Sequence, residues 1–193
     1  VSFGSTTSLS DEEVEQIALG LERSGQKFMW VLRDADTGDV SIGEGRKAQL
    51  PEGYEERVDG RGVILREWAP QLEVLGHPST GGFMSHCGWN SCVESISMGV
   101  PMAAWPMHSD QPRNAILVTK ILKTGLIVGD LAHQAESFKA EVVEDAVKRL
   151  MNSTEGQEMR KRAEELSDAL KQSVIKGSDN STEMDTFIAH ITR

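Results

Sequence analysis

The most chemically varied stretch of the sequence is residues 86–91, which reads His-Cys-Gly-Trp-Asn-Ser between two apolar runs. This pattern predicts a buried strand that ends at His86, a sharp turn at Gly88 and a helix that starts near Trp89. The start of a helix offers free N–H groups and the positive end of the helix dipole, which favour a bound phosphate. His86, Asn90 and Ser91 would add side-chain donors to such a site.

Glu94 follows one helical turn later, on the same side as Asn90 and Ser91. A carboxylate at that place suits ribose hydroxyls, as an acidic residue does in dinucleotide-binding folds. The alternative is structural: Asn90 or Ser91 caps the helix, and Glu94 is an acid favoured by the helix dipole. The turn by itself leaves both interpretations open.

The only two cysteines, Cys87 and Cys92, are five positions apart. With His86 they match no zinc spacing and lack a fourth ligand, so we expect no metal and interpret them as buried thiols. Two cysteines also make no disulfide framework, which indicates a reducing compartment and predicts a cytoplasmic protein.

Three other predicted turns carry residues suited to a ligand. Trp68 could stack on a flat base while the small Ala69 exposes its backbone to the base edge, although a lone Trp is also typical of a sheet-edge core. Asp110 and Gln111 could bind neighbouring sugar hydroxyls, although Asp110 is also a good helix N-cap. The Gly4-Ser5-Thr6 turn fits a second phosphate contact or a plain turn, and we assign His108 no role.

These turns belong to an alternation of strands and helices. Strands are expected near 1–3, 27–33, 62–67, 81–86, 100–105 and 124–129, and helices follow the Ser10 capping box and lie near 71–76, 90–98 and 111–123. From 138 to 193 only helices are expected, near 138–152, 155–175 and 182–192. The alternation predicts a Rossmann-like, doubly wound parallel α/β sheet with an all-helical C-terminal tail, whose ligand lies where the strands' carboxyl ends gather.

Composition limits the classes of function. The chain has 193 residues, 38% of them hydrophobic, and a net charge of −10, which is typical of one globular domain and disfavours a nucleic-acid partner. No apolar run reaches the length of a membrane span. Because Val1-Ser2-Phe3 already reads as a strand, we expect residues 1–193 to be one domain of a longer protein.

Read together, residues 68–111 resemble the 44-residue signature of plant family 1 UDP-sugar glycosyltransferases, with no position outside the pattern. The rest of the chain, from "VSFGS" to "MDTFIAHITR", is similar to the C-terminal half of that family. The stretch "MHSDQPRNAILVTKILKTGLIV" and the tail look most like its zeatin O-glucosyltransferase branch.

The resemblance implies a GT-B fold of two facing Rossmann-like halves, of which the C-terminal half binds a UDP-sugar and neither uses a metal. It implies that Trp68 stacks on the uracil and that Ala69 binds the uracil edge. It assigns the ribose to Gln71 and Glu94, and the phosphates to His86, Asn90, Ser91 and Ser5. It assigns the sugar to Trp89, Asp110 and Gln111, and Gln111 is usual where the donor is UDP-glucose.

The resemblance also implies direct displacement with inversion, by a base that lies in the N-terminal half. We therefore expect no catalytic residue in this chain, and a small acceptor such as a cytokinin that binds through the other half. The last helix, with Met184, Phe187, Ile188 and Ile191 on one face, is expected to pack on that half. Two other classes stay open: a module for another nucleotide such as NAD, against which the single glycine of "FGSTTS" counts, and a non-catalytic interaction fragment.

Overall fold

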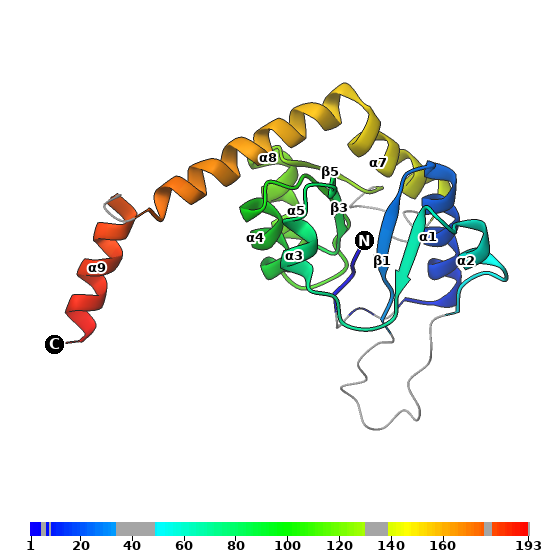
Figure 1. Cartoon of the computed structure of the whole chain (residues 1–193), viewed down its shortest axis with the longest axis horizontal. Coiled ribbons are helices and arrows are strands. Elements are labelled where there is room, and N and C mark those ends of the chain that lie inside the picture. Colours follow the sequence, from blue (N-terminus) through cyan, green and yellow to red (C-terminus); the bar gives the residue numbers. More distant parts are fainter. Residues whose placement is uncertain (5–6, 8, 34–48, 130–138, 176–178, 193) are drawn as a thin grey trace.

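The computed structural model describes residues 1–4, 7, 9–33, 49–129, 139–175 and 179–192. Its strands are β1 (Phe28–Val31), β2 (Gly62–Leu65), β3 (Phe83–Ser85), β4 (Met102–Ala104) and β5 (Gly125–Ile127). Between them lie α1 (Asp11–Ser24), α2 (Tyr54–Arg57), α3 (Gln71–Leu75), α4 (Trp89–Ser97), α5 (Gln111–Ile116) and the π-helix η1 (Leu117–Ile121). The helices α7 (Ala140–Asn152), α8 (Thr154–Ser173) and α9 (Asp179–Ile191) follow (Figure 1).

All strand pairs are parallel, and the order of the strands is that of a doubly wound sheet. β1 pairs with β2, and β3, β4 and β5 pair in that order. Ser2 bridges the two groups, because it pairs with Val31 on one side and with Ser85 on the other. The segment around Ser2 thus lies between β1 and β3, and the chain reverses its direction of winding there. Ligands of open α/β sheets bind at such a switch point. The parallel pairing and this strand order confirm the predicted fold class.

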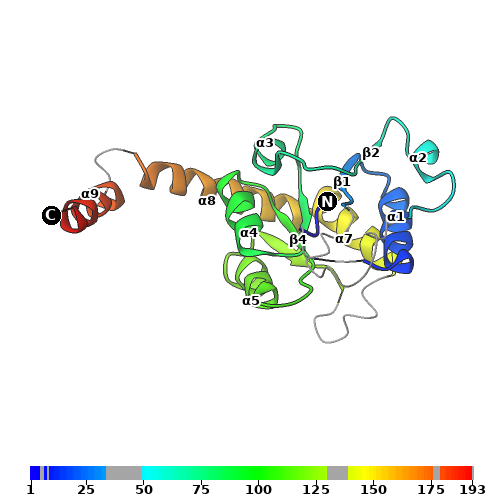
Figure 2. The ribbon, with the colours of Figure 1, turned by 90° about the horizontal axis from the view of Figure 1, so that it is seen from below.

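The sheet separates two hydrophobic cores, because neighbouring residues of a strand point to opposite faces. In β4, Ala103 lies in the core with α1 and α7, whereas Met102 and Ala104 lie in the core with α3, α4 and α5. Figure 2 shows these two sets of helices around the sheet. The helices therefore cover both faces, and the strands stay short and apolar between them.

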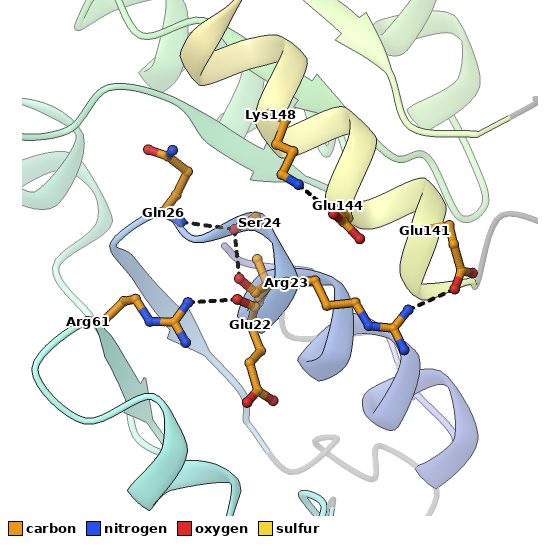
Figure 3. Close-up of polar contacts among 9 residues, drawn as sticks. Glu22, Arg23, Ser24, Gln26, Arg61, Glu141, Glu144 and Lys148 are labelled. Carbon is orange, nitrogen blue, oxygen red and sulfur yellow. Dashed lines mark hydrogen bonds and ion pairs between the residues drawn. The ribbon is translucent and has the colours of Figure 1, made fainter.

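Helix α1 is defined by its ends and by the helix it packs against. The predicted capping box is present, since Ser10 and Glu13 exchange side chain to backbone hydrogen bonds, and Gly25 ends the helix with φ of 70°. On its outer side Arg23 pairs with Glu141 of α7 at 2.7 Å, next to the hydrogen bond that Arg61 donates to the backbone carbonyl of Glu22 (Figure 3). The ion pair is half exposed and contributes little, so the buried apolar stripe of α1 holds the two helices together.

The C-terminal helices differ in how they meet the sheet. α7 buries Val143, Ala146 and Leu150 in the core, so it is an integral part of the fold. α8 buries Met159 in the same core and packs against α4, where Ser167 donates to the carbonyl of Ser97. Its C-terminal end extends away from the sheet, and both views place α9 beyond that end (Figures 1 and 2). Four apolar side chains of α9 are 46–61% exposed: Met184, Phe187, Ile188 and Ile191. Within the described ranges, no helix combines the length and apolar character that crossing a bilayer requires.

Candidate functional site

Three of the predicted ligand-binding turns leave the sheet at the same edge. The parallel register aligns Ser85, at the end of β3, with Ala104 at the end of β4 and with Ser2. The turns 66–70, 86–88 and 105–110 follow the ends of β2, β3 and β4, and Gly4 follows Ser2. The residues that the sequence singled out therefore gather at the carboxyl edge, with the exception of Ser5, which lies outside the described residues.

The amino end of α4 is free of side-chain caps. Its N-cap is Gly88, which has no side chain to offer, and neither Asn90 nor Ser91 caps the helix. Both are instead inside the first turn, so the structural interpretation of these two residues is wrong. The first amides of a helix have no partner within it, and here they open toward the turn between β3 and α4. Such an end can bind an anion.

His86 lies beneath this helix end, enclosed by two glycines. A side chain on Gly4 would place its Cβ 2.6 Å from His86 Nε2, and one on Gly88 would place it at 2.5 Å. The imidazole is buried, and this burial, followed by the charge of His108, lowers the pKa of His86. His86 is thus a neutral imidazole at neutral pH. A neutral imidazole carries a single N–H and brings no positive charge, and a hydrogen bond with the Ser2 backbone acts on the pKa of His86 in the opposite direction to burial.

Gln71 connects the turn after β2 with helix α4. Its Nε2 donates to Ser91 Oγ at 2.9 Å and to Glu94 Oε2 at 2.8 Å. The structure therefore brings together three residues that the sequence places 20 and 23 positions apart. The bond from Gln71 orients the Glu94 carboxylate, and its other oxygen has no hydrogen-bond partner among the described residues, so it can accept from a ligand hydroxyl.

Two tryptophans stand exposed beside these residues. Trp68 is 75% exposed and Trp89 is 52% exposed, so neither belongs to the core. The alternative of Trp68 as a buried sheet-edge residue is therefore wrong, and β2 ends three residues before it, at Leu65. An exposed indole next to a polar site is available to stack on a flat ring. Ala69, the next residue, is half-buried.

The turn after β4 is held by two amide side chains. Gln111 is only 4% exposed, and its Oε1 accepts from the backbone N–H groups of Met107 (2.8 Å) and His108 (3.0 Å). Asn114 Nδ2 donates to the carbonyl of Cys87 at 3.0 Å and to Asp110 Oδ2 at 2.8 Å. Asp110 occupies the N-cap position of α5, but its side chain makes no capping bond.

Asn114 is a residue that sequence reasoning missed. It ties the turn after β3 to the turn after β4, and it orients the Asp110 carboxylate. The available signal was its spacing, since a residue four positions after Asp110 lies on the same face of a helix. Nothing in the sequence could indicate its second bond, because that bond crosses to another strand.

The two cysteines form a packing contact at the start of α4. Cys87 precedes the N-cap and Cys92 lies in the following turn, the two positions of a hydrophobic staple, and both are fully buried. Contact with Cys92 and burial raise the pKa of Cys87, whose Sγ donates to the Ser85 carbonyl at 3.5 Å. Cys87 is therefore a protonated thiol at neutral pH. No cluster of three or more His, Cys, Asp or Glu residues suited to a metal occurs among the described residues.

Residues 1–179 match the family described as UDP-glucoronosyl and UDP-glucosyl transferase. The chain belongs to this family. It is 59% identical over its whole length to both the zeatin O-glucosyltransferase of Phaseolus lunatus and the zeatin O-xylosyltransferase of Phaseolus vulgaris. The chain spans 42% and 43% of the length of these two relatives and corresponds to their C-terminal part. The predicted zeatin-related branch is thereby confirmed.

Solved plant structures of the family share the fold. The apo structure of Phytolacca americana UGT2 superposes with a TM-score of 0.87 at 36% identity, over all of this chain and 43% of that one. The complex of the same enzyme with UDP-2fluoro-glucose and pterostilbene gives 0.84, over 98% of this chain and 40% of that one. This UDP-glycosyltransferase chain thus has the architecture of one part of the plant GT-B enzymes.

Proposed function

We propose that this chain binds the UDP-sugar donor of an inverting glycosyltransferase. The proposal is based on the two hydrogen bonds that Gln71 donates, one to Ser91 and one to Glu94. In a nucleoside diphosphate sugar the ribose lies between the base and the phosphates. Gln71, three residues after the exposed Trp68, likewise connects that segment to α4, whose amino end is uncapped, through its bonds to Ser91 and Glu94. A carboxylate held by this connection suits the ribose hydroxyls.

The diphosphate is proposed to lie against the amino end of α4. The free amides of the first turn, the N–H of neutral His86 and the side chains of Asn90 and Ser91 are all donors, and phosphate oxygens only accept. Donors fixed before the reaction also stabilise the charge that develops on the departing UDP. The proposed reaction therefore takes the UDP-sugar as co-substrate and calls for neither a metal nor a further cofactor.

UDP-glucose is the donor we propose, and a hydroxyl of a small plant metabolite is the acceptor. The glucosyl and xylosyl relatives are equally similar to this chain, so the choice rests on Gln111. Its oxygen is taken up by the turn, and its Nε2, which lies 3.5 Å from His108 Nδ1, has a second N–H that can donate to the sugar. Zeatin or another cytokinin is proposed from the relatives. The acceptor site and the base are proposed to lie in the part of the relatives that this chain does not span, and a cytoplasmic site of action agrees with its two free thiols.

Calorimetry with UDP, UDP-glucose, UDP-xylose and NAD tests the binding proposal. We expect UDP and both UDP-sugars to bind, UDP-glucose more tightly than UDP-xylose, and NAD not to bind. Glu94→Gln removes the carboxylate that is proposed to bind the ribose hydroxyls, and it should weaken the affinity for UDP by about tenfold. Glu73→Gln makes the same change of charge at an exposed position of α3 and should bind as the wild type does. Binding of NAD in place of UDP would refute the proposal.

The preference for glucose is tested with Gln111→Glu. Glutamate keeps an oxygen where Oε1 accepts from the turn, but it lacks the Nε2 donor. We expect this variant still to bind UDP and to lose the difference between UDP-glucose and UDP-xylose. The chain mixed with UDP-glucose and zeatin should release no glucoside, since the base is proposed to lie elsewhere, and a glucoside product would contradict that assignment.

A further inference from the structure

The turn after β4 exposes one histidine to which the proposed function gives no task. His108 lies between Met107 and Ser109, and its side chain is exposed. Ser109 has φ of 59°, which is uncommon for a residue with a Cβ, so the turn has an unusual but defined shape. The bonds that hold this turn also determine which nitrogen of His108 carries its proton.

The orientation of the Gln111 amide is fixed by the backbone of the turn. One of its two terminal atoms lies 2.8 Å from Met107 N and 3.0 Å from His108 N. Both backbone groups donate, so this atom must be the carbonyl oxygen, and the other terminal atom must be the amide nitrogen. An amide nitrogen only donates. Whatever lies next to Gln111 Nε2 must therefore accept.

The neighbour of Gln111 Nε2 is the imidazole of His108. The distance from Gln111 Nε2 to His108 Nδ1 is 3.5 Å, and Ser109 Oγ, whose hydroxyl can donate, lies 3.1 Å from the same Nδ1. The Gln111 amide nitrogen can only donate, so its contact requires Nδ1 to accept. The Ser109 hydroxyl can donate or accept, which is compatible with that role. A neutral His108 then carries its proton on Nε2. His108 therefore presents an N–H donor from the other nitrogen of its ring.

His108 stands close to the phosphate end of the site. The ends of β3 and β4 are adjacent, since Ser85 pairs with Ala104, and His86 and His108 each follow one of these ends. Asn114 ties the turns that follow these ends, because its Nδ2 donates to the carbonyl of Cys87, next to His86, and to Asp110, two residues after His108. The charges of His108 and Asp110 also influence the pKa of His86, in opposite directions.

We propose that His108 is a further donor-binding residue, whose Nε2–H donates a hydrogen bond to a diphosphate oxygen of the sugar nucleotide. The inference rests on the proposed function. A phosphate oxygen is the fitting partner because it only accepts and is negatively charged, and a hydrogen bond to a charged group is the stronger kind. A sugar hydroxyl would find a better partner in the neighbouring Asp110, which accepts.

The test compares His108→Asn with His108→Gln by calorimetry on the 193-residue chain. The amide of Asn reaches only to the place of Nδ1, whereas the amide nitrogen of Gln reaches toward the place of Nε2. We expect Asn to weaken UDP binding by about tenfold and Gln to restore most of that loss. Uridine, which has no phosphate, should compete equally well in all three proteins. His77→Asn removes an exposed imidazole at the opposite edge of the sheet and should bind UDP as the wild type does.

Each outcome separates this inference from the proposed function. If the wild-type chain does not bind UDP, the proposed function fails and the inference fails with it. If the wild type binds UDP and His108→Asn binds it equally well, only the inference is overturned. Weaker binding of UDP-glucose without weaker binding of UDP would assign His108 to the sugar, and weaker binding of uridine would indicate a structural role. Either result overturns the phosphate contact.

Discussion

Substitution of Gly88 by alanine tests how tightly the imidazole of His86 is held. Gly88 has φ of −56° and ψ of 143°, a conformation that any residue adopts, so alanine adds no backbone strain. The new Cβ would instead lie 2.5 Å from His86 Nε2 and 3.1 Å from Cε1, where an ordinary contact is 3.4–4 Å. The imidazole or the turn must therefore move by close to an ångström.

The size of the effect follows from two opposing contributions. Forcing a methyl group into a filled space destabilises a protein by about 1–3 kcal/mol. Replacing glycine by alanine also restricts the unfolded chain, which stabilises by about 0.4–1 kcal/mol. We expect Gly88→Ala to lower the free energy of unfolding by roughly 1–2 kcal/mol. If the His86 imidazole, a proposed hydrogen-bond donor to the diphosphate, is displaced, the affinity for UDP should fall by about tenfold.

Urea unfolding and UDP calorimetry measure the two effects, and two other glycines serve as controls. Gly60 has φ of 71° and nothing near its missing Cβ, so Gly60→Ala reports backbone strain alone. Gly4 combines φ of 77° with a Cβ position 2.6 Å from His86 Nε2. Gly4→Ala should therefore lower the free energy of unfolding by nearly the sum of the decreases caused by Gly88→Ala and Gly60→Ala. Gly60→Ala should leave UDP binding unchanged.

A second substitution, at His86, tests whether contact with the imidazole is the cause of the destabilisation. In a His86→Ala background the imidazole is absent, so Gly88→Ala should no longer destabilise, while Gly4→Ala should keep only its backbone strain. If Gly88→Ala destabilises both backgrounds equally, the contact with His86 is not the cause, and the enclosed imidazole is not what requires a glycine there.

Three further predictions concern the ribose contacts, the buried imidazole and the last helix. Gln71→Leu removes both bonds to α4 and should weaken UDP by about tenfold while lowering stability by about 1 kcal/mol, and calorimetry that finds unchanged affinity would contradict the assignment. The pKa of His86 is lowered in the folded chain, so below about pH 6.5 the unfolded chain binds more protons than the folded chain. The stability of the wild type should therefore fall as the pH drops below this value. The fall should be smaller in His86→Asn. Equal pH dependence of the two proteins in urea titrations would refute this. Phe187→Ser and Ile191→Ser should change stability by less than about 0.5 kcal/mol, because these side chains are 58% and 61% exposed, and a larger loss would mean that α9 packs within the chain.

Local patterns were sufficient to predict the elements that position the site. The capping box at Ser10, the glycine end of α1 and the alternation of short apolar runs with helices are all local, and the structure confirms each of them. The turns then follow from the fold class, because parallel strands bring their carboxyl ends to one edge. A chain with this alternation has few other ways to cover both faces of its sheet.

The contacts between turns could not be predicted in the same way. Asn114 binds the carbonyl of Cys87 in the turn after β3, and Gln71 binds two residues of α4. Neither bond leaves a periodic trace in the sequence. Gln111 shows the difference most clearly: its residue type indicated a ligand contact, but its oxygen is taken up by the backbone of its own turn. Ser5 remains a prediction.

The staple of Cys87 and Cys92 gives the chain a native chemical reporter on the first turn of α4. Both thiols are fully buried, so a thiol reagent reaches them only after this turn has opened. When opening is fast and reversible, the rate of alkylation is the reactivity of a free thiol multiplied by the fraction of chains that are open. These are the only cysteines of the sequence, so the total labelling rate follows this turn without an introduced probe. The fraction of chains in which the amino end of α4 is open can thus be followed in the unmodified protein.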